Sequence, residues 1–484
     1  MNLDKLLIDV STPELLEEEF NRYKKIKTDE LISPPKVNIQ VGVDGVSWEG
    51  FEKDIKNQCL YISNRIKNGT YFFNPFREVP IAKKANTQIF KEKKPSDERI
   101  ISISCIRDVL AQRVIYKAIN EQIESEFSEY QNISFAYRKG KSAPEAAQLI
   151  YKYILSGYTF VLDADIEGFF DNISHKITMD KIGGIIDVDQ DPILYSYMRR
   201  FISVDRVKWE DYKKNYKKFH NVKPKRTVRQ KGIPQGGVLS GLIANLFLHD
   251  FDKWIINELG KRFDLKYVRY ADDFVVLMKD LGKVGTVKRL IKEKLDEIEL
   301  KLHSNPEKTK KIDLTMIGTY VDFVGFSISP TGIRIKHSNI VRFKSKLSEM
   351  IDETSFFEGK KKLNPLISKF TYKLLGNETL GLRKCISCSL YERRRSWINY
   401  FSIITDVQQL RGLDFWIRKQ LYNTYFKETG KRLKAIELSQ YQLPRFERLY
   451  YRTKKIKIEK FCSCEILARD FQREVLVDHL FKYS

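Results

Sequence analysis

Long apolar runs are missing from this 484-residue chain. No uninterrupted apolar stretch approaches the roughly 20 residues that a helix needs to cross a bilayer. The N-terminal segment MNLDKLLIDVSTPELLEEEF is acidic and lacks the cationic-then-apolar order of a secretion signal. We therefore expect a cytoplasmic protein with no membrane partner.

Cysteine is also scarce, with 6 residues in the whole chain, and a cytoplasmic protein needs no disulfides. Cys385 and Cys388 form a CxxC motif, and Cys462 and Cys464 form a CxC motif. Together they could supply four zinc ligands. However, the intervening sequence is long and neither pair lies in a ligand-rich knuckle, so the sequence favours ordinary reduced cysteines.

Repeats, low-complexity tracts and flexible Gly/Ser linkers are absent as well. A helix is expected over residues 13–25. Short strands alternate with helices over 36–160, the densest motifs lie in 160–330, and the pattern becomes mainly helical and basic from 335 onward. This succession predicts a mixed α and β protein with more than one core.

Acidic residues are outnumbered by basic ones. The chain has 86 Lys and Arg against 63 Asp and Glu, a formal net charge of +23. Polyanions are the natural partners of such a surface. Charge alone does not decide between nucleic acid, an anionic membrane and a basic surface without a partner.

Three elements in the middle of the chain combine apolar patterning with acidic or glycine-rich ends. TFVLDAD (159–165) predicts a buried strand that ends in carboxylates. YVRYADDFVVL (267–277) predicts two apolar strands joined by a tight acidic turn. Between them, apolar residues recur at helical spacing and predict an amphipathic helix over 237–256.

The acidic ends of the strand and the hairpin suit one type of chemistry. Asp165, Asp272 and Asp273 offer the hard oxygen ligands that Mg²⁺ prefers, provided that folding brings them together. Two such ions would activate a 3′-hydroxyl and hold a leaving pyrophosphate. Taken singly, an Asp-Asp pair is more often a plain turn, and a lone strand-end Asp is more often a cap.

The motifs around these aspartates resemble those of reverse transcriptases, in particular the bacterial and organellar branch typified by group II intron enzymes. The resemblance covers residues 40–425, with the blocks in the order of that family. The matching blocks are GVDG (42–45), REVPIAKK (77–84), RIISISCIRDVLAQR (99–113), SFAYRKGKSAPEAA (134–147), VLDADIEGFFDNISH (161–175), KGIPQGGVLSGLIANLFLHDFD (231–252), YADD (270–273), LHSNPEKTKKI (302–312) and FVGF (323–326).

The resemblance implies that Asp165 and Asp272 ligate two Mg²⁺ ions, with Mn²⁺ as the alternative metal. It gives Asp273 an assisting role and adds the backbone carbonyl of Ile166 as a ligand. These three aspartates are the expected catalytic residues.

The same resemblance implies a nucleotide site. Arg99 would grip the triphosphate, together with Lys83 or Lys84, and Gln235 would lie beside the nucleotide and the template base. Phe170 would exclude a 2′-hydroxyl, although it could also be a core residue. Lys308 would donate a proton to pyrophosphate or, equally, be a solvated lysine.

Basic segments predict where the nucleic acid binds. Residues 206–231 hold eleven Lys or Arg against two acids, with aromatic residues interleaved. A second basic group precedes WINYF (397–401), which resembles the helical thumb of intron-encoded enzymes. The expected contacts are Lys213, Lys217, Lys225, Arg226, Arg229, Arg393, Arg394 and Arg395.

The fold implied is an α+β right-hand polymerase, with fingers and an antiparallel palm sheet followed by an α-helical thumb. The expected parts are an N-terminal extension (1–60), fingers (61–158), a palm with fingers insertions (159–330), the thumb (331–425) and a basic helical C-terminal extension (426–484).

The function implied is RNA-directed DNA synthesis, with an RNA template, dNTPs and a DNA product. Residues 426–484 show neither a DNA-binding tail nor the endonuclease of many intron proteins. This favours a stand-alone enzyme of the kind found in antiphage defence, where the template is a dedicated non-coding RNA. Two alternatives remain open: an RNA-binding splicing cofactor like an intron maturase, and an RNA-making polymerase. The primer type and homo-oligomerisation are also left open.

Overall fold

The computed structural model of the protein describes residues 2–27, 41–82, 98–212, 225–354, 356, 362–380, 382–385, 388–392, 394–455, 462 and 471–473. The chain divides into two compact units: residues 1–142 with 160–311, and residues 143–159 with 312–484. The five-part division expected from the sequence stays a prediction. No helix in the described ranges combines the length and the apolar composition that crossing a bilayer would require.

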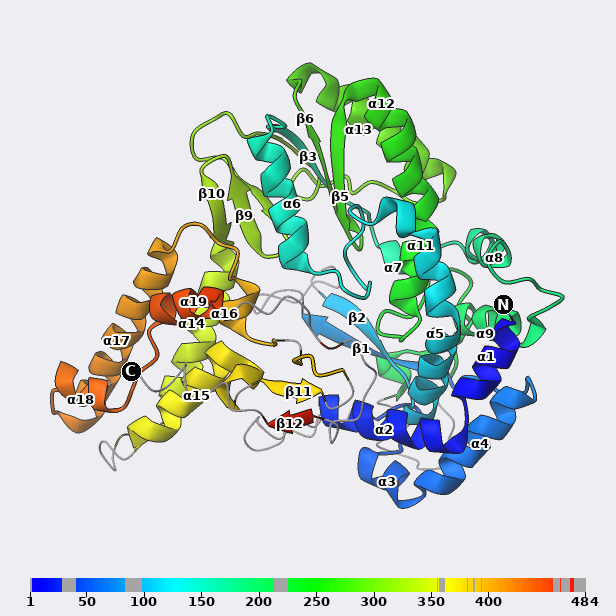
Figure 1. The fold of residues 1–484 in the computed structure, drawn as a ribbon, viewed down its shortest axis with the longest axis horizontal. Helices are drawn as coiled ribbons and strands as arrows, with labels where there is room; N and C mark the ends of the chain where they lie inside the picture. The colour runs from blue at the N-terminus through cyan, green and yellow to red at the C-terminus, as the bar shows by residue number, and fades with distance from the viewer. Residues whose placement is uncertain are drawn as a thin grey trace. The chain divides into compact units, whose positions relative to one another are not determined.

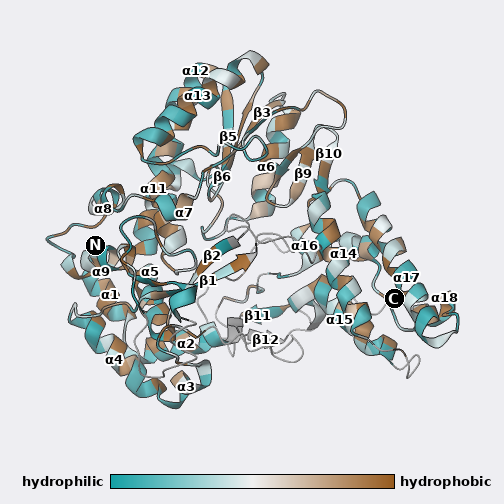
Figure 2. Cartoon of the chain, turned by 180° about the vertical axis from the view of Figure 1, so that it is seen from behind, coloured by the Kyte–Doolittle hydropathy of each residue, from teal (hydrophilic) through white to brown (hydrophobic). Residues whose placement is uncertain are grey.

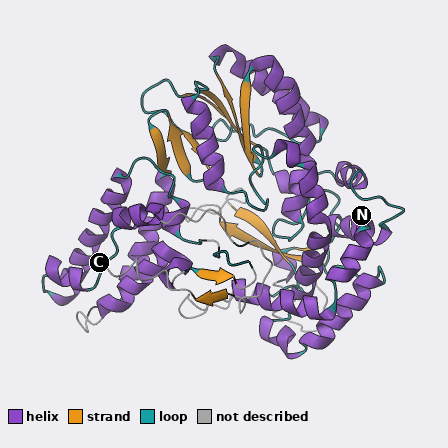
Figure 3. Ribbon diagram, in the orientation of Figure 1, coloured by secondary structure: helices purple, strands orange, loops and turns teal. Residues whose placement is uncertain are grey.

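The first unit mixes helices with two small sheets (Figures 1 and 3). Its helices are α1 (Leu3–Val10), α2 (Pro13–Lys27), α3 (Trp48–Lys53), α4 (Ile55–Lys67), α5 (Ile106–Glu126), α7 (Phe169–Asn172), α8 (His175–Gly183), α9 (Pro192–Ile202), α11 (Ser240–Trp254), α12 (Gly260–Phe263) and α13 (Leu281–Glu297). The helix expected over 13–25 is confirmed as α2. The helix expected over 237–256 is confirmed as α11, which continues into a π-helical turn at Ile255–Leu259.

Helices α5 and α11 form the centre of the apolar core of this unit. Leu110 and Val114 of α5, and Ile243 and Phe247 of α11, are buried at the three- and four-residue spacing of a helix face. Most residues of both helices are buried, and in Figure 2 brown, hydrophobic segments alternate with teal, hydrophilic ones along them. This packing holds the glycine-rich start of α11 in place.

The palm sheet of the first unit has the strand order β5-β6-β3-β7. Its strands are β5 (Leu265–Tyr270), β6 (Asp273–Met278), β3 (Phe160–Asp165) and β7 (Lys310–Asp313). Both the strand expected at 159–165 and the hairpin expected at 267–277 are confirmed. In the antiparallel pairing of β3 with β6, Asp165 lies opposite Asp273 and Phe160 lies opposite Met278.

A second sheet carries Arg99, which is expected to grip the triphosphate. Strand β1 (Phe76–Ala82) pairs antiparallel with β2 (Glu98–Ile103) and parallel with the short β4 (Arg206–Val207). Arg99 lies near the start of β2, opposite Ile81, and both residues are exposed.

The second unit is mainly helical after its first strands (Figure 3). Its elements are α6 (Ala143–Leu155), β8 (Val321–Phe323), β9 (Phe326–Ser329), β10 (Gly332–Ile335), α14 (His337–Asp352), α15 (Leu363–Leu375), β11 (Arg383–Cys385), α16 (Trp397–Tyr400), α17 (Gln408–Thr429), α18 (Ala435–Gln440), α19 (Phe446–Lys455) and β12 (Phe471–Arg473). The hairpin expected at FVGF is confirmed as β8–β9. Its two turn residues, Val324 and Gly325, have φ of 43° and 91°, as type I′ turns require.

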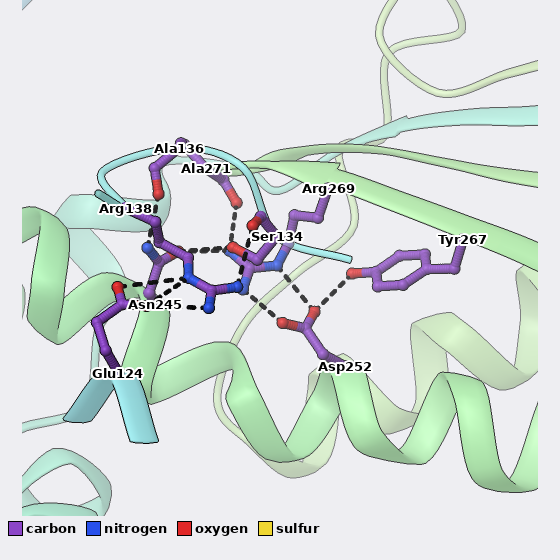
Figure 4. Close-up of polar contacts among 9 residues, drawn as sticks. All are labelled: Glu124, Ser134, Ala136, Arg138, Asn245, Asp252, Tyr267, Arg269 and Ala271. Atoms are coloured by element: carbon purple, nitrogen blue, oxygen red, sulfur yellow. Dashed lines mark hydrogen bonds and ion pairs between the residues drawn. The ribbon is translucent and has the colours of Figure 1, made fainter. Parts of the chain in front are cut away.

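A buried ion pair locks the β5–β6 hairpin onto α11 (Figure 4). The Arg269 side chain, only 1% exposed, donates to Asp252 from Nε at 2.8 Å and from Nη2 at 2.5 Å. Its Nη1 donates to the carbonyl of Ala271 at 3.0 Å, which lies in the turn itself. Since Ala271 has a φ of 59°, an unfavourable value for a residue with a Cβ, this contact helps to hold a strained turn in place.

The same network fixes the loop that precedes α6. The side chain of Asn245 on α11 accepts from Arg269 at 3.0 Å and donates to the carbonyl of Ala136 at 2.7 Å. On the backbone, Arg269 donates to Ile133 at 2.7 Å and accepts from Phe135 at 3.1 Å. Residues 133–136 are therefore tied to both the hairpin and α11.

We predict that Arg269→Met lowers the free energy of unfolding by about 3–5 kcal/mol, because it leaves the buried Asp252 carboxylate without its cation. Urea denaturation followed by circular dichroism measures this change. The double variant Arg269→Met/Asp252→Leu should recover much of the loss, since no buried charge then remains.

Arg289→Met is the matched control. Arg289 forms an ion pair with Glu293 on α13, with side chains 64% and 54% exposed, and its loss should change stability by less than about 0.5 kcal/mol. An Arg269 variant that is no less stable than this control would contradict the role assigned to the buried pair.

Candidate active site

Folding brings together the three aspartates that are far apart in the chain. Asp165 is the last residue of β3, and Asp273 is its register partner at the first position of β6. Asp272 is the second residue of the two-residue turn that joins β5 to β6. The positive φ at Ala271 alone, with an ordinary φ at Asp272, is the pattern of a type II′ hairpin turn.

The carboxylates perturb one another. Burial, followed by the negative charge of Asp165, raises the pKa of Asp272. Although solvent reaches the Asp273 side chain, the surrounding protein desolvates its carboxylate. That desolvation, together with the charges of Asp272 and Asp165, raises the pKa of Asp273 to about 7. Such a cluster is relieved by a bound cation.

Lys308 supplies one positive charge to this cluster. Its Nζ lies 2.8 Å from Oδ2 of Asp165, and this hydrogen bond is the largest cause that raises the pKa of the lysine. The Lys308 side chain is 55% exposed, so it can move away from Asp165. This contact does not by itself decide between proton donation and a solvated lysine.

The segment before Lys308 is hydrogen-bonded to the end of β3. The backbone N–H of His303 donates to the carbonyl of Asp165 at 2.8 Å, and Ile166 forms a β-bridge with Leu302. Ile166 therefore lies directly beside the aspartates. Its carbonyl as a metal ligand stays a prediction.

The donor set fits divalent Mg²⁺ or Mn²⁺. All the converging side chains offer hard carboxylate oxygens, the ligands that these ions prefer. Asp165 is 8% exposed, and its main neighbours in the cluster are like charges and one lysine. Asp165 and Asp272, with Asp273, are the residues that would hold the metal.

Arg99 lies near the aspartate cluster, and Gln235 contacts Arg99. The Arg99 guanidinium is close enough to lower the pKa of Asp272, against the larger effect of burial. With its amide oriented to satisfy both neighbours, Gln235 accepts from Arg99 Nε at 3.2 Å and donates to the carbonyl of Ile100 at 3.2 Å. The two residues expected to contact the nucleotide are thus in contact with each other.

A glycine makes this contact possible. Gly236 has a φ of 122°, and a Cβ there would lie 2.7 Å from the carbonyl oxygen of Ser102. The backbone N–H of Ser102 in turn donates to the carbonyl of Gln235 at 2.8 Å. Only glycine allows the loop to lie this close to β2, and this explains part of the GIPQGG sequence.

Phe170 lies 8% exposed at the start of the short helix α7. Its carbonyl accepts from Ile233 at 2.8 Å, which ties it to the loop that carries Gln235. Its ring packs edge-on against Tyr137, with the ring centroids 6.3 Å apart. The structure therefore places Phe170 between the core and this site, in agreement with both roles that the sequence left open.

Tyr137 is a candidate site residue that the sequence did not single out. Burial and the charge of Asp272 raise its pKa, so its hydroxyl lies near the turn aspartates. It has a φ of 57°, and a Cβ on Gly241 of α11 would lie 2.5 Å from its Cγ. The only sequence signal is its position inside the SFAYRKGK block.

The predicted nucleic-acid contacts differ in exposure. Lys225, Arg226 and Arg395 are exposed. Arg229 is 5% exposed, with Nη2 3.9 Å from Glu78. Arg394 donates to Glu378 at 2.9 Å and 2.5 Å and to the carbonyl of Thr453 at 3.2 Å, so its guanidinium is used in packing. The predictions for Lys83, Lys84, Lys213, Lys217 and Arg393 fall outside the described residues.

The family comparison agrees with this geometry. The model of the family described as "Reverse transcriptase (RNA-dependent DNA polymerase)" matches residues 89–328, which include every aspartate of the cluster. Residues 89–328 form a reverse transcriptase domain. The α+β fold class with an antiparallel palm sheet, predicted for a right-hand polymerase, is confirmed.

The curated relatives include intron-encoded proteins. Group II intron-encoded protein LtrA of Lactococcus lactis subsp. cremoris is 25% identical over 372 residues, which cover 63% of this chain and 53% of LtrA. Protein YkfC of Escherichia coli (strain K12) is 26% identical over 306 residues, which cover 56% of this chain and 71% of YkfC. The chain thus spans about half the length of LtrA.

The solved structures that the chain matches include two telomerases. Telomerase from Candida albicans, in complex with a fragment of telomeric RNA, gives a TM-score of 0.40 at 13% identity, covering 81% of this chain and 68% of the telomerase. Apo telomerase from Candida tropicalis gives a TM-score of 0.43 at 12% identity, covering 92% of this chain and 82% of the telomerase.

We predict that metal binding depends on pH through Asp273. In the metal-free protein, the folded state keeps the Asp273 proton up to about pH 7, whereas the unfolded chain loses it near the ordinary pKa of 3.8. Stability without metal should therefore fall as pH rises through this window and level off above it. Because metal competes with the proton, thermal stabilisation by saturating MgCl₂ should be larger at about pH 8 than at about pH 6.

Asp273→Asn should remove most of this pH dependence, whereas Asp296→Asn, an exposed change on α13, should leave it unchanged. Equal stabilisation by MgCl₂ at both pH values in the unmodified protein would show that no carboxylate with a raised pKa takes part in metal binding.

Proposed function

We propose that this chain is an RNA-directed DNA polymerase that extends a 3′-hydroxyl on an RNA template. The observation that supports it most directly is the convergence of Asp165 with Asp272 and Asp273 beside Arg99 and Gln235. Binding RNA without chemistry does not require clustered carboxylates. The surplus of basic residues, a net charge of +23, suits the polyanionic template and product.

Asp165, Asp272 and Asp273 would hold two Mg²⁺ or Mn²⁺ ions, which supply activation of the 3′-hydroxyl and stabilisation of the leaving pyrophosphate. The protein must also bind and orient the nucleotide. Arg99 suits this task because a planar guanidinium forms paired hydrogen bonds with phosphate oxygens. On nucleotide binding it would exchange its contact with Gln235 for the triphosphate, which frees the Gln235 amide for the nucleotide or the template base.

Lys308 would act on the leaving group. Because its pKa is raised, the ammonium stays protonated at neutral pH. Because Lys308 is 55% exposed, it could leave Asp165 in the metal-bound enzyme and turn towards the pyrophosphate, to which it would donate a hydrogen bond or a proton. Lys308→Gln should then slow catalysis more than it weakens nucleotide binding.

Phe170 and Tyr137 would set the choice of sugar. Their rings meet edge-on. Phe170 is buried and its carbonyl accepts from Ile233, whereas Tyr137 is 52% exposed and lies against Gly241 of α11. An aromatic wall under the sugar would exclude a 2′-hydroxyl and thereby favour dNTPs over rNTPs.

We predict that purified protein extends a DNA primer on an RNA template with dNTPs and MgCl₂. Asp272→Asn and Asp165→Asn should each reduce the rate by about 10²-fold or more, because each removes a charged metal ligand. Gel-based primer extension measures the rate, and Asp296→Asn on α13 is the matched aspartate control. Extension that survives both active-site substitutions would refute the proposal.

The same assay with rNTPs tests the aromatic wall. Phe170→Ala should raise the use of rNTPs relative to dNTPs by about 10-fold or more, since it opens space of more than one methylene. An unmodified protein that prefers rNTPs would indicate an RNA-making polymerase instead.

The intron-encoded relatives support a second candidate, an RNA-binding splicing cofactor. In that case the protein would promote splicing of an intron RNA, and Asp272→Asn would leave splicing intact. Loss of primer extension with full retention of a biological effect would favour this candidate.

For the biological role, we propose copying of a dedicated non-coding RNA into cDNA during antiphage defence. The support is the resemblance of the motifs around Asp165 and Asp272 to bacterial reverse transcriptases, a group that includes enzymes of antiphage defence. We expect one RNA and its complementary DNA to co-purify with the protein from cells, and Asp272→Ala to abolish both the cDNA and protection in a plaque assay. Protection that persists without cDNA would contradict this role.

A further inference from the structure

The CxxC motif lies on a hairpin in the second unit. Strand β11 ends at Cys385, whose N–H donates to the carbonyl of Leu390 at 2.8 Å. Two residues further from the loop on each side of the hairpin, the N–H of Glu392 donates to the carbonyl of Arg383 at 2.8 Å. Between these two hydrogen bonds, Lys384 forms a β-bridge with Tyr391. The chain thus returns antiparallel to β11, and Cys388 lies in the connecting loop.

The loop turns back immediately after the second cysteine. Ser389 has a φ of 57°, and its N–H donates to the carbonyl of Cys385 at 2.9 Å. A left-handed residue at this position closes the loop tightly. As a result, the side chains of Cys385 and Cys388 lie near each other.

A third cysteine reaches this hairpin from far along the chain. The backbone N–H of Cys462 donates to the carbonyl of Tyr391 at 2.8 Å. The sulfur atoms of Cys385, Cys388 and Cys462 all lie within 4.8 Å of one another. None of the three is in a disulfide, and Cys385 is 1% exposed. The long separation in sequence, which argued against a zinc site, is therefore bridged by the fold.

This arrangement fits a soft metal. In a tetrahedral site with Zn–S bonds of about 2.3 Å, the sulfurs are about 3.8 Å apart, so only small side-chain adjustments are needed. Thiolates select zinc over the hard ions that suit the aspartate cluster. The stretch beyond Cys462 also pairs with the hairpin, because β12 is antiparallel to β11 with Cys385 opposite Phe471. A metal here would fasten the segment at Cys462 to the β11 hairpin.

We propose that Cys385, Cys388 and Cys462 bind a structural zinc ion that ties the C-terminal stretch to the β11 hairpin. The site is independent of the polymerase chemistry. In sequence, Cys464 follows at CxC spacing and lies outside the described residues.

Elemental analysis by inductively coupled plasma mass spectrometry should find about one zinc per molecule in the full chain purified without chelators. Cys385→Ser/Cys388→Ser should reduce this to a few per cent. Cys59→Ala is the matched control, because burial raises the pKa of the Cys59 thiol to about 12 and makes it a poor ligand. Asp272→Asn should keep its zinc, which separates this proposal from the polymerase proposal.

Two measurements need no cysteine variant. A mercurial that blocks thiols should release one equivalent of zinc from the unmodified chain and lower its thermal midpoint. Replacement of zinc by Co²⁺ should give thiolate-to-cobalt charge-transfer absorption and strong tetrahedral d–d bands. The proposal is overturned if the unmodified chain holds no zinc even after incubation with ZnCl₂, if the double variant keeps its zinc, or if the thiols are found as a disulfide without metal.

Discussion

The register between β3 and β6 is the constraint on which the active site depends. With Asp165 opposite Asp273, the carboxylates of a strand end and a hairpin turn meet at one end of the two inner strands of the palm sheet. Side chains alternate between the faces of a sheet, so a slip of one residue would turn Asp165 to the other face. The apolar residues that follow in β6, Phe274 to Met278, are fully buried and fix this register. The buried pair of Arg269 and Asp252 then fixes the turn in which Asp272 lies.

Desolvation of the aspartates, followed by their mutual repulsion, is the electrostatic cost of this site, and a bound metal would relieve it. Asp272 and Asp273 have raised pKa values because they are desolvated beside other carboxylates, and Lys308 offsets only part of that charge. Rigidity elsewhere makes the repulsion tolerable: the turn carbonyl is held by Arg269, and the loop before α6 is held by Asn245. Stability and function are thus divided between different residues, since Arg269 and Asn245, which keep the turn and the loop in place, are not the residues that would bind metal.

Much of this arrangement could be predicted from the sequence, because local patterns determined it. The two apolar runs around the acidic turn in 267–277 and the apolar run ending at Asp165 predicted the correct strands, and helical spacing predicted α11. Long-range packing could not be predicted. The sequence around Arg394 does not show whether its guanidinium contacts phosphate or pairs with the buried Glu378. The position of the Tyr137 ring depends on the lack of a side chain at Gly241, a contact that the sequence does not reveal either. The cysteines show the same limit, since only folding brings position 462 to the hairpin.

The central claim is that a strand end and a distant turn share one cation site. A crystal of the protein grown with MnCl₂, with the anomalous signal of manganese recorded, tests it most directly. We expect a manganese peak within about 2.2 Å of carboxylate oxygens from both Asp165 and Asp272. Manganese bound by the 272–273 turn alone, with Asp165 still paired to Lys308, would contradict the account.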